Sequence, residues 1–208
     1  MAELYLMNVS EAERIPAAYC LERFPRRYER AEKYKNKADT LRSVAAGALV
    51  AGVLGVGEDE ISHGEWGKPY LPGGDRFFSL SHSGEYALLA VSYSDIGADI
   101  EKVTVYRDAV ARRVFTPDER EWIRQDPDRR FFELWTAKES VIKLDGRGLS
   151  LGMETFFALD LVRGGTIMLD DRKVYGYSTV FGGYCISACA CEKLTSPPLT
   201  VITAEDLI

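Results

Sequence analysis

The sequence predicts an α+β fold made of two halves of similar size, and three observations support this prediction. Strand-like runs occur in the first half and recur in the last third of the chain, between residues 77–101 and 166–191. Helical patterns lie between them, and turn residues rather than a low-complexity linker connect the segments. The 208 residues are 46% hydrophobic, which is enough for one large domain or two small ones with a real core.

The first half begins with a predicted edge strand at residues 4–9, followed by a basic segment. Residues 38–54 form a predicted helix, which Asp39 or Thr40 begins and Gly55 ends. A loop rich in glycine and proline covers residues 64–75. Three predicted strands follow, at residues 77–80, 86–92 and 96–101.

The second half begins with helices. A helix is predicted over residues 106–115, and Pro117 opens the next one, residues 118–124, with Thr116 as its N-cap. A long helix follows at residues 129–144. The remaining strand-like runs are residues 155–159, 166–169, 174–180 and 184–191.

Composition excludes several classes of protein. The first residues lack the basic stretch that precedes the apolar core of a secretion signal, and the longest nearly apolar run, residues 44–57, is too short for a membrane span. The four cysteines show neither a disulfide framework nor a zinc-ligand pattern. A net charge of −6 argues against a general nucleic-acid binder. We therefore expect a cytoplasmic enzyme without nucleic-acid or membrane partners.

Basic residues nevertheless gather in one segment. Residues 22–42 carry eight arginines and lysines against four acidic residues, which indicates either one anionic ligand or an ordinary exposed helix. Residues 107–130 contain seven arginines, which indicates either a surface for an acidic partner or a solvated helical face.

Two pairs of charged residues indicate chemistry. Asp99 and Glu101 lie two apart in a predicted strand, so both side chains point to one face. Glu139 and Lys143 lie four apart in the long helix, so they share a helical face. Three carboxylates beside an ammonium suit a Mg²⁺ ion acting on a phosphate. Either pair alone could also be a chance pair or a solvated salt bridge.

Five motifs occur together with these pairs in a fixed order. They are residues 67–69 (Gly-Lys-Pro), 78–84 (Phe-Ser-Leu-Ser-His-Ser-Gly), 96–102 (Ile-Gly-Ala-Asp-Ile-Glu-Lys), 132–143 (Phe-Glu-Leu-Trp-Thr-Ala-Lys-Glu-Ser-Val-Ile-Lys) and 146–151 (Gly-Arg-Gly-Leu-Ser-Leu). Together they resemble the surfactin-synthetase-activating (Sfp-type) class of 4′-phosphopantetheinyl transferases. This resemblance implies two pseudo-symmetric α/β halves, residues 1–101 and 102–208, with the active site at their interface.

The resemblance also implies a reaction and a set of site residues. Such enzymes move the phosphopantetheine arm of coenzyme A to a serine of an apo acyl or peptidyl carrier protein, releasing 3′,5′-ADP. Asp99, Glu101 and Glu139 match the ligands of Mg²⁺, and Lys143 matches the lysine that contacts the phosphate of the leaving group. Glu139 is our candidate for the base, directly or through a metal-bound water. The implied coenzyme A contacts are Arg27, Arg30, Ser43, Lys68, Pro69, Tyr70, Leu71, Ser81, His82, Asp99, Lys138 and Lys143.

Two other functions remain as alternatives. A metal-dependent phosphodiesterase or nuclease could use the same acidic groups, but it should show a longer basic stripe. A non-catalytic carrier-protein-binding module would have no need of three converging carboxylates. The single-chain class that the sequence resembles further leads us to expect a monomer.

Overall fold

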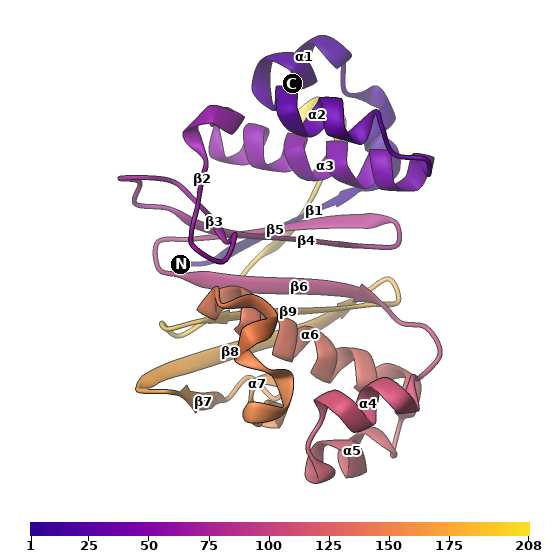
Figure 1. Ribbon diagram of the computed structural model, residues 1–208, viewed down its shortest axis with the longest axis vertical. Coiled ribbons are helices and arrows are strands. Elements are labelled where there is room, and N and C mark those ends of the chain that lie inside the picture. The colour runs from indigo at the N-terminus through magenta and orange to yellow at the C-terminus, as the bar shows by residue number, and fades with distance from the viewer.

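The computed structural model describes the backbone of residues 1–208 and every side chain except that of Leu149. Two four-stranded sheets stack face to face, and a layer of helices covers the outer face of each (Figure 1). The layers therefore run from helices α1–α3 through the first and second sheets to helices α4–α7. This arrangement confirms the predicted α+β class.

The first sheet has the strand order β10-β1-β5-β4. Its strands are β1 (Glu3–Asn8), β4 (Phe77–Ser83), β5 (Tyr86–Ser92) and β10 (Leu199–Ile202). β1 was predicted as an edge strand, and this is wrong, because β5 pairs with it on one side and β10 on the other. The pairing with β10 is parallel and joins the two ends of the chain. A local sequence pattern cannot predict a contact between such distant segments.

Three helices cover the first sheet: α1 (Ala17–Arg23), α2 (Pro25–Ala31) and α3 (Lys37–Leu54). The cap of α3 is Asn36, whose side chain accepts a hydrogen bond from Ala38 N, rather than Asp39 or Thr40. Gly55 ends α3 in the left-handed conformation, as predicted. The remaining short elements of this half are η1 (Val9–Arg14), η2 (Glu58–Glu60), β2 (Ser62–His63) and β3 (Pro69–Tyr70).

The second sheet is antiparallel throughout and has the order β6-β9-β8-β7. Its strands are β6 (Ile96–Lys102), β7 (Thr166–Leu169), β8 (Arg172–Phe181) and β9 (Tyr184–Ala190). β6 pairs with β9, and β10 pairs with β1, so the two sheets do not divide the chain at residue 101. The division into two pseudo-symmetric halves stays a prediction.

Four helices cover the second sheet: α4 (Asp108–Val114), α5 (Pro117–Ile123), α6 (Pro127–Asp145) and α7 (Leu159–Val162). Thr116 caps α5 and Pro117 begins it, as predicted. The strand predicted over residues 155–159 is wrong, since this stretch runs from a short helical turn to the start of α7. The remaining turns are η3 (Gly148–Leu151), η4 (Met153–Thr155) and η5 (Ala204–Asp206).

Three hydrophobic cores hold the layers together, and β5 shows how one strand serves two of them. Ala87, Leu89 and Val91 face α1–α3, whereas Leu88 and Ala90 face the second sheet. The edge strands β4 and β6 pack side by side, one from each sheet. Among the described residues, no helix combines the length and apolar composition that a membrane span needs.

Candidate functional site

The site is built where β6 of the second sheet lies against α6. Ile96, Ala98 and Ile100 point into the core between the sheets. The alternation of a strand therefore turns Asp99 and Glu101 to the other face, as predicted. Gly97 shares this face, and α6 packs so closely on it that an added Cβ would lie 2.0 Å from Ser140 O.

α6 presents Glu139 and Lys143 to this strand, one helical turn apart. Lys143 Nζ donates a hydrogen bond to Asp99 Oδ1 over 2.6 Å. The Asp99 side chain is only 5% exposed and that of Lys143 28%, so the ion pair is largely shielded from water. Lys143 of α6 and Asp99 of β6 thus form a direct ion pair.

The three carboxylates also influence one another. Burial raises the pKa of Glu139 from 4.5 to about 7, and the charge of Asp99 adds to this effect, with a smaller contribution from Glu101. Burial raises the pKa of Glu101 as well, and its hydrogen bond from Ser83 opposes the shift. A group of acids whose ionisation is unfavourable in this way favours the binding of a cation.

The acids do not form a closed metal cage. Among the described side chains, no three histidine, cysteine, aspartate or glutamate residues stand close enough together to hold a metal ion as they are. Asp99 Oδ2, however, is a buried oxygen without a hydrogen-bond partner in the described part of the chain. A buried carboxylate oxygen in this state suits a hard cation, so Asp99 fits Mg²⁺. Glu101 and Glu139 carry further carboxylate oxygens, the type of donor that such a cation prefers.

Ser81 and His82 do not act as a pair. Ser81 is buried, and its Oγ donates to Asp99 Oδ1 over 2.6 Å, so this hydroxyl is directed at the carboxylates rather than at an anion pocket. His82, the next residue of β4, points to the opposite face. Ser81 was expected to contact coenzyme A, as was His82; its hydroxyl bonds to Asp99 in this structure, and the expected contact of Ser81 with coenzyme A stays a prediction.

His82 lines a cavity of about 410 Å³ that is rich in cations. The other residues around it are Arg27, Arg30, Tyr34, Asp39, Arg42 and Ser43. Burial lowers the pKa of Arg27, and the neighbouring positive charge of Arg30 lowers it further. Partial burial lowers the pKa of His82 too, and the charges of Arg42, Lys143 and Arg27 add to this, although the residue keeps an exposed side. A neutral imidazole can still donate one N–H to a phosphate oxygen.

The predicted nucleotide loop forms the wall of a second cavity, of about 250 Å³, that reaches Lys143. Lys68 and Pro69 line it, but Lys68 Nζ bonds to Asp95 and to the carbonyl of Leu144 at the end of α6. Lys68 therefore holds the loop against α6. Tyr70 is exposed, whereas Leu71 packs on the core between α1–α3 and the first sheet.

Lys138 corrects a prediction. It was expected to contact phosphate beside Glu139, but its side chain is fully buried on the other side of α6. Its Nζ forms an ion pair with the buried Glu119 at 3.0 Å and donates to the carbonyls of Met153 and Phe156. Neighbouring residues of a helix do not face the same way, so Lys138 cannot join Glu139 in the site.

The structure adds a third cavity that sequence reasoning missed. It measures about 320 Å³ and lies where β6 ends, between α4 and α6. Glu101 and Ser83 form its polar side, and Phe132 and Trp135 of α6 form an aromatic side. Ser83 belongs to the motif at residues 78–84. Its spacing of two from Ser81 was the signal in the sequence that the two serines share a face of the strand. Glu101 thus borders a partly aromatic cavity, while the cationic cavity around His82 lies on the opposite face of β4 from the Ser81–Asp99 hydrogen bond.

Comparisons with known proteins identify the family. Residues 95–189 match the model of the 4′-phosphopantetheinyl transferase superfamily. The chain is 30% identical over 200 residues to the 4′-phosphopantetheinyl transferase Sfp of Bacillus subtilis (strain 168), covering 88% of this chain and 89% of Sfp.

Two further relatives agree. A 4′-phosphopantetheinyl transferase of Bacillus subtilis is 35% identical over 161 residues, which are 72% of this chain and 70% of that protein. The transferase gsp of Aneurinibacillus migulanus is 30% identical over 190 residues, or 84% and 79% of the two chains. With the ordered motifs and the geometry of β6 and α6, these similarities lead to one conclusion. The chain belongs to the 4′-phosphopantetheinyl transferase superfamily.

Proposed function

We propose that this protein transfers the 4′-phosphopantetheine arm of coenzyme A to a serine of an apo carrier protein and releases 3′,5′-ADP. One observation carries the proposal: Lys143 and the carboxylates of Asp99, Glu101 and Glu139 gather where α6 meets β6, and cavities open beside Lys143 and beside Glu101. The three relatives described above are named as transferases, and their names favour neither a nuclease nor a non-catalytic module.

The cationic cavity suits the 3′-phosphate of coenzyme A. Arg27 and Arg30 lie at its wall with Ser43 and His82, so a dianionic phosphate would receive charge-assisted hydrogen bonds there. Binding an anion would also offset the burial and the repulsion from Arg30 that lower the pKa of Arg27. The pyrophosphate would then extend from this cavity toward Lys143.

The residues of α6 have distinct roles in the reaction. The serine oxygen of the carrier attacks the phosphorus that bears the pantetheine arm, and the bond to the adenosine phosphate breaks. Glu139 accepts the serine proton, directly or through a bound water. Lys143 moves from Asp99 toward the pyrophosphate and balances the negative charge that grows on the leaving 3′,5′-ADP.

Asp99, Glu101 and Glu139 would hold the Mg²⁺ ion on which we propose that the reaction depends. The ion would supply Lewis-acid polarisation of the pyrophosphate oxygens. The unpartnered Asp99 Oδ2 is the observation on this chain that supports such a ligand.

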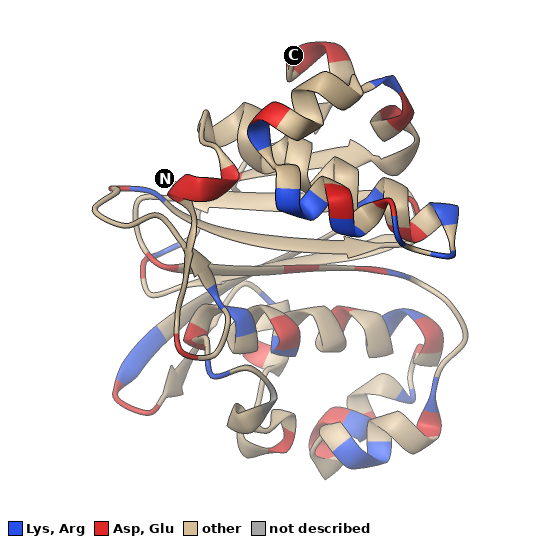
Figure 2. Ribbon diagram, turned by 45° about the horizontal axis from the view of Figure 1, so that its top comes forward, with Lys and Arg blue, Asp and Glu red and all other residues tan. Residues whose placement is uncertain are grey.

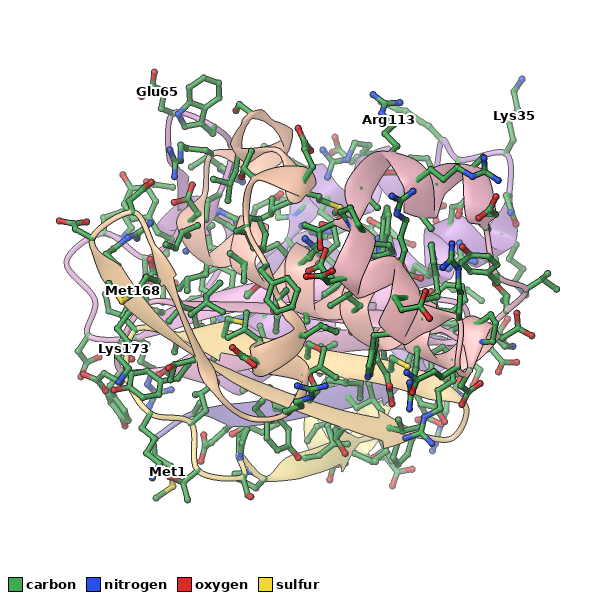
Figure 3. The ribbon with its side chains drawn as sticks, turned by 90° about the horizontal axis from the view of Figure 1, so that it is seen from below. Met1, Lys35, Glu65, Arg113, Met168 and Lys173 are labelled. Carbon is green, nitrogen blue, oxygen red and sulfur yellow. The ribbon has the colours of Figure 1, made fainter. Side chains whose placement is uncertain are left out.

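The carrier protein would approach over α4 and α5. Figure 2 shows basic residues on these helices, and the arginines of this region are Arg107, Arg112, Arg113, Arg120, Arg124, Arg129 and Arg130. Arg112, Arg124 and Arg129 already form ion pairs with acids on their own helices. Arg113 projects into solvent (Figure 3), so it is available for an acidic carrier helix.

Two further expectations complete the proposal. One chain supplies all the residues invoked here, so a monomer is sufficient for activity. The four cysteines are free thiols in the structure, which suits the reducing cytoplasm where coenzyme A is used.

Mass spectrometry tests the proposal. The protein is incubated with coenzyme A, Mg²⁺ and a panel of apo acyl and peptidyl carriers, and the carriers are weighed. We expect at least one carrier to gain the mass of one phosphopantetheine, with 3′,5′-ADP formed in equal amount. A matched reaction with a carrier whose acceptor serine is alanine should show no gain. If the folded protein leaves every carrier of the panel unmodified, the proposal is refuted.

A further inference from the structure

Three serines of β4 line the boundary between the two sheets. Ser79, Ser81 and Ser83 alternate along the strand, so their side chains share one face. That face meets β6, the edge strand of the other sheet, which runs beside β4 in the same direction. The two strands are joined here by serine hydroxyls instead of a backbone ladder.

Each serine has a different partner on β6. Ser79 Oγ accepts a hydrogen bond from Ala98 N over 3.0 Å. Ser81 Oγ donates to Asp99 Oδ1 over 2.6 Å, and Ser83 Oγ donates to Glu101 Oε2 over 2.6 Å. Two of the three serines therefore hold a carboxylate of the site, while the third holds only the backbone.

The hydroxyl of Ser83 has a fixed direction. It accepts a hydrogen bond from Lys102 N over 3.1 Å, so its own hydrogen is free to be directed at Glu101. One oxygen of Glu101 is thereby occupied, and Oε1 is left for another ligand. The same division occurs at Asp99, where Oδ1 bonds to Ser81 and Lys143 while Oδ2 has no partner among the described residues.

We propose that Ser83 is a positioning residue of the metal site, which fixes Glu101 so that Oε1 faces the ion, and that Ser81 does the same for Asp99. This inference rests on the proposed function, because it assumes that these carboxylates bind Mg²⁺. It assigns the ion to two particular oxygens, Asp99 Oδ2 and Glu101 Oε1.

The need for such a residue follows from the length of the glutamate side chain. Glu101 stands near the end of β6, is partly exposed and borders the third cavity, so packing alone leaves several rotamers open to it. A hydrogen bond from the neighbouring sheet selects one of them before the ion arrives. Loss of an outer partner of this kind typically weakens metal binding about 10- to 100-fold.

An isosteric pair of variants tests the role of the hydroxyl. Ser83→Thr keeps the hydroxyl. Ser83→Val lacks it, and valine has nearly the same shape as threonine. Ser79→Ala is the matched control. Ser79 lies on the same face of the same strand, but its hydroxyl bonds to no carboxylate. Each protein is titrated with Mg²⁺ in the presence of coenzyme A by calorimetry, and thermal unfolding without metal shows whether each variant is folded.

We expect Ser83→Val to weaken Mg²⁺ binding about tenfold, and Ser83→Thr and Ser79→Ala to stay within about twofold of wild type. In carrier loading, saturating Mg²⁺ should restore most of the turnover of Ser83→Val. Wild-type affinity in Ser83→Val, or equal weakening in Ser83→Thr and Ser83→Val, would overturn the inference. If Ser83→Val does not fold, Ser83→Ala replaces it under the same criteria.

The wild-type protein separates this inference from the proposed function. Failure of the wild type to load any carrier would count against the function, whatever the serine variants do. Loading by the wild type together with unchanged Mg²⁺ affinity in Ser83→Val would count against the positioning role alone.

Discussion

Gly97 offers the sharpest test of the close contact between β6 and α6. A Cβ at this position would lie 2.0 Å from Ser140 O, 2.3 Å from Leu144 N and 2.9 Å from Leu144 Cα. All three atoms belong to the backbone of α6, so no side chain can turn aside to make room. The helix must retreat by roughly 1.4 Å before the nearest contact reaches an ordinary distance.

The consequence for Gly97→Ala follows from what α6 carries. Glu139 and Lys143 would move away from Asp99 with the helix, and a misplacement of about 1 Å can cost about 100-fold in rate. We therefore expect carrier loading by Gly97→Ala to fall about 100-fold. Overpacking should also lower the free energy of unfolding by about 1–3 kcal/mol.

Gly176→Ala is the matched control for this prediction. Its Cβ would lie 2.6 Å from Leu161 Cα, so β8 and α7 would be overpacked in the same way but away from the carboxylates. We expect a similar loss of stability and nearly full activity. Initial rates of carrier loading and urea unfolding would be measured for both variants. Wild-type rates in Gly97→Ala, or an equal loss of rate in Gly176→Ala, would refute the reasoning.

Three further predictions concern charge. Arg30→Glu should weaken binding of coenzyme A at least about tenfold more than that of dephospho-coenzyme A, as measured by calorimetry; equal losses would remove Arg30 from the 3′-phosphate site. Burial and the charge of Asp99 raise the pKa of Glu139 to about 7 in the folded protein without metal. The free energy of unfolding of the wild type should therefore fall, relative to that of Glu139→Gln, as the pH rises from about 5 to about 8. Mg²⁺ should reduce this fall. Parallel melting curves of the two proteins across this range would contradict that shift. Arg113→Glu should raise the KM for the carrier several-fold and leave that for coenzyme A unchanged, and steady-state kinetics showing no change in either would exclude Arg113 from the carrier surface.

Local patterns predicted the elements that build the site. The alternation of β6 placed Asp99 and Glu101 on one face, and the helical spacing of four placed Glu139 and Lys143 together. These predictions succeeded because both periods are fixed by backbone geometry. The capping of α5 by Thr116 was also predictable, because an N-cap depends only on neighbouring residues.

The errors arose where the outcome depends on distant parts of the chain. β1 lies inside its sheet because β10 returns from the other end of the chain, and no pattern near β1 records this. Residues 155–159 look like a strand, but the carbonyls of Met153 and Phe156 bond to the buried Lys138 instead of to a neighbouring strand. Tertiary contacts outweighed local preference there.

For two pairs of neighbouring residues, the sequence alone could have shown that their side chains face different ways. Lys138 and Glu139 are adjacent in a helix, so their side chains had to point in different directions. Ser81 and His82 are adjacent in a strand, so they had to face opposite sides. The family motif drew attention to the residue types, whereas the periodicity of the element decides which of them can reach the same ligand.

A structure of the protein with coenzyme A and Mn²⁺ in place of Mg²⁺ would test the central claim most directly, because anomalous scattering locates the ion. We predict one ion coordinated by Asp99 and Glu101 of β6 and by Glu139 of α6, and also by oxygens of the pyrophosphate. An ion bound to coenzyme A alone, or held by the strand acids with Glu139 turned away, would contradict the account.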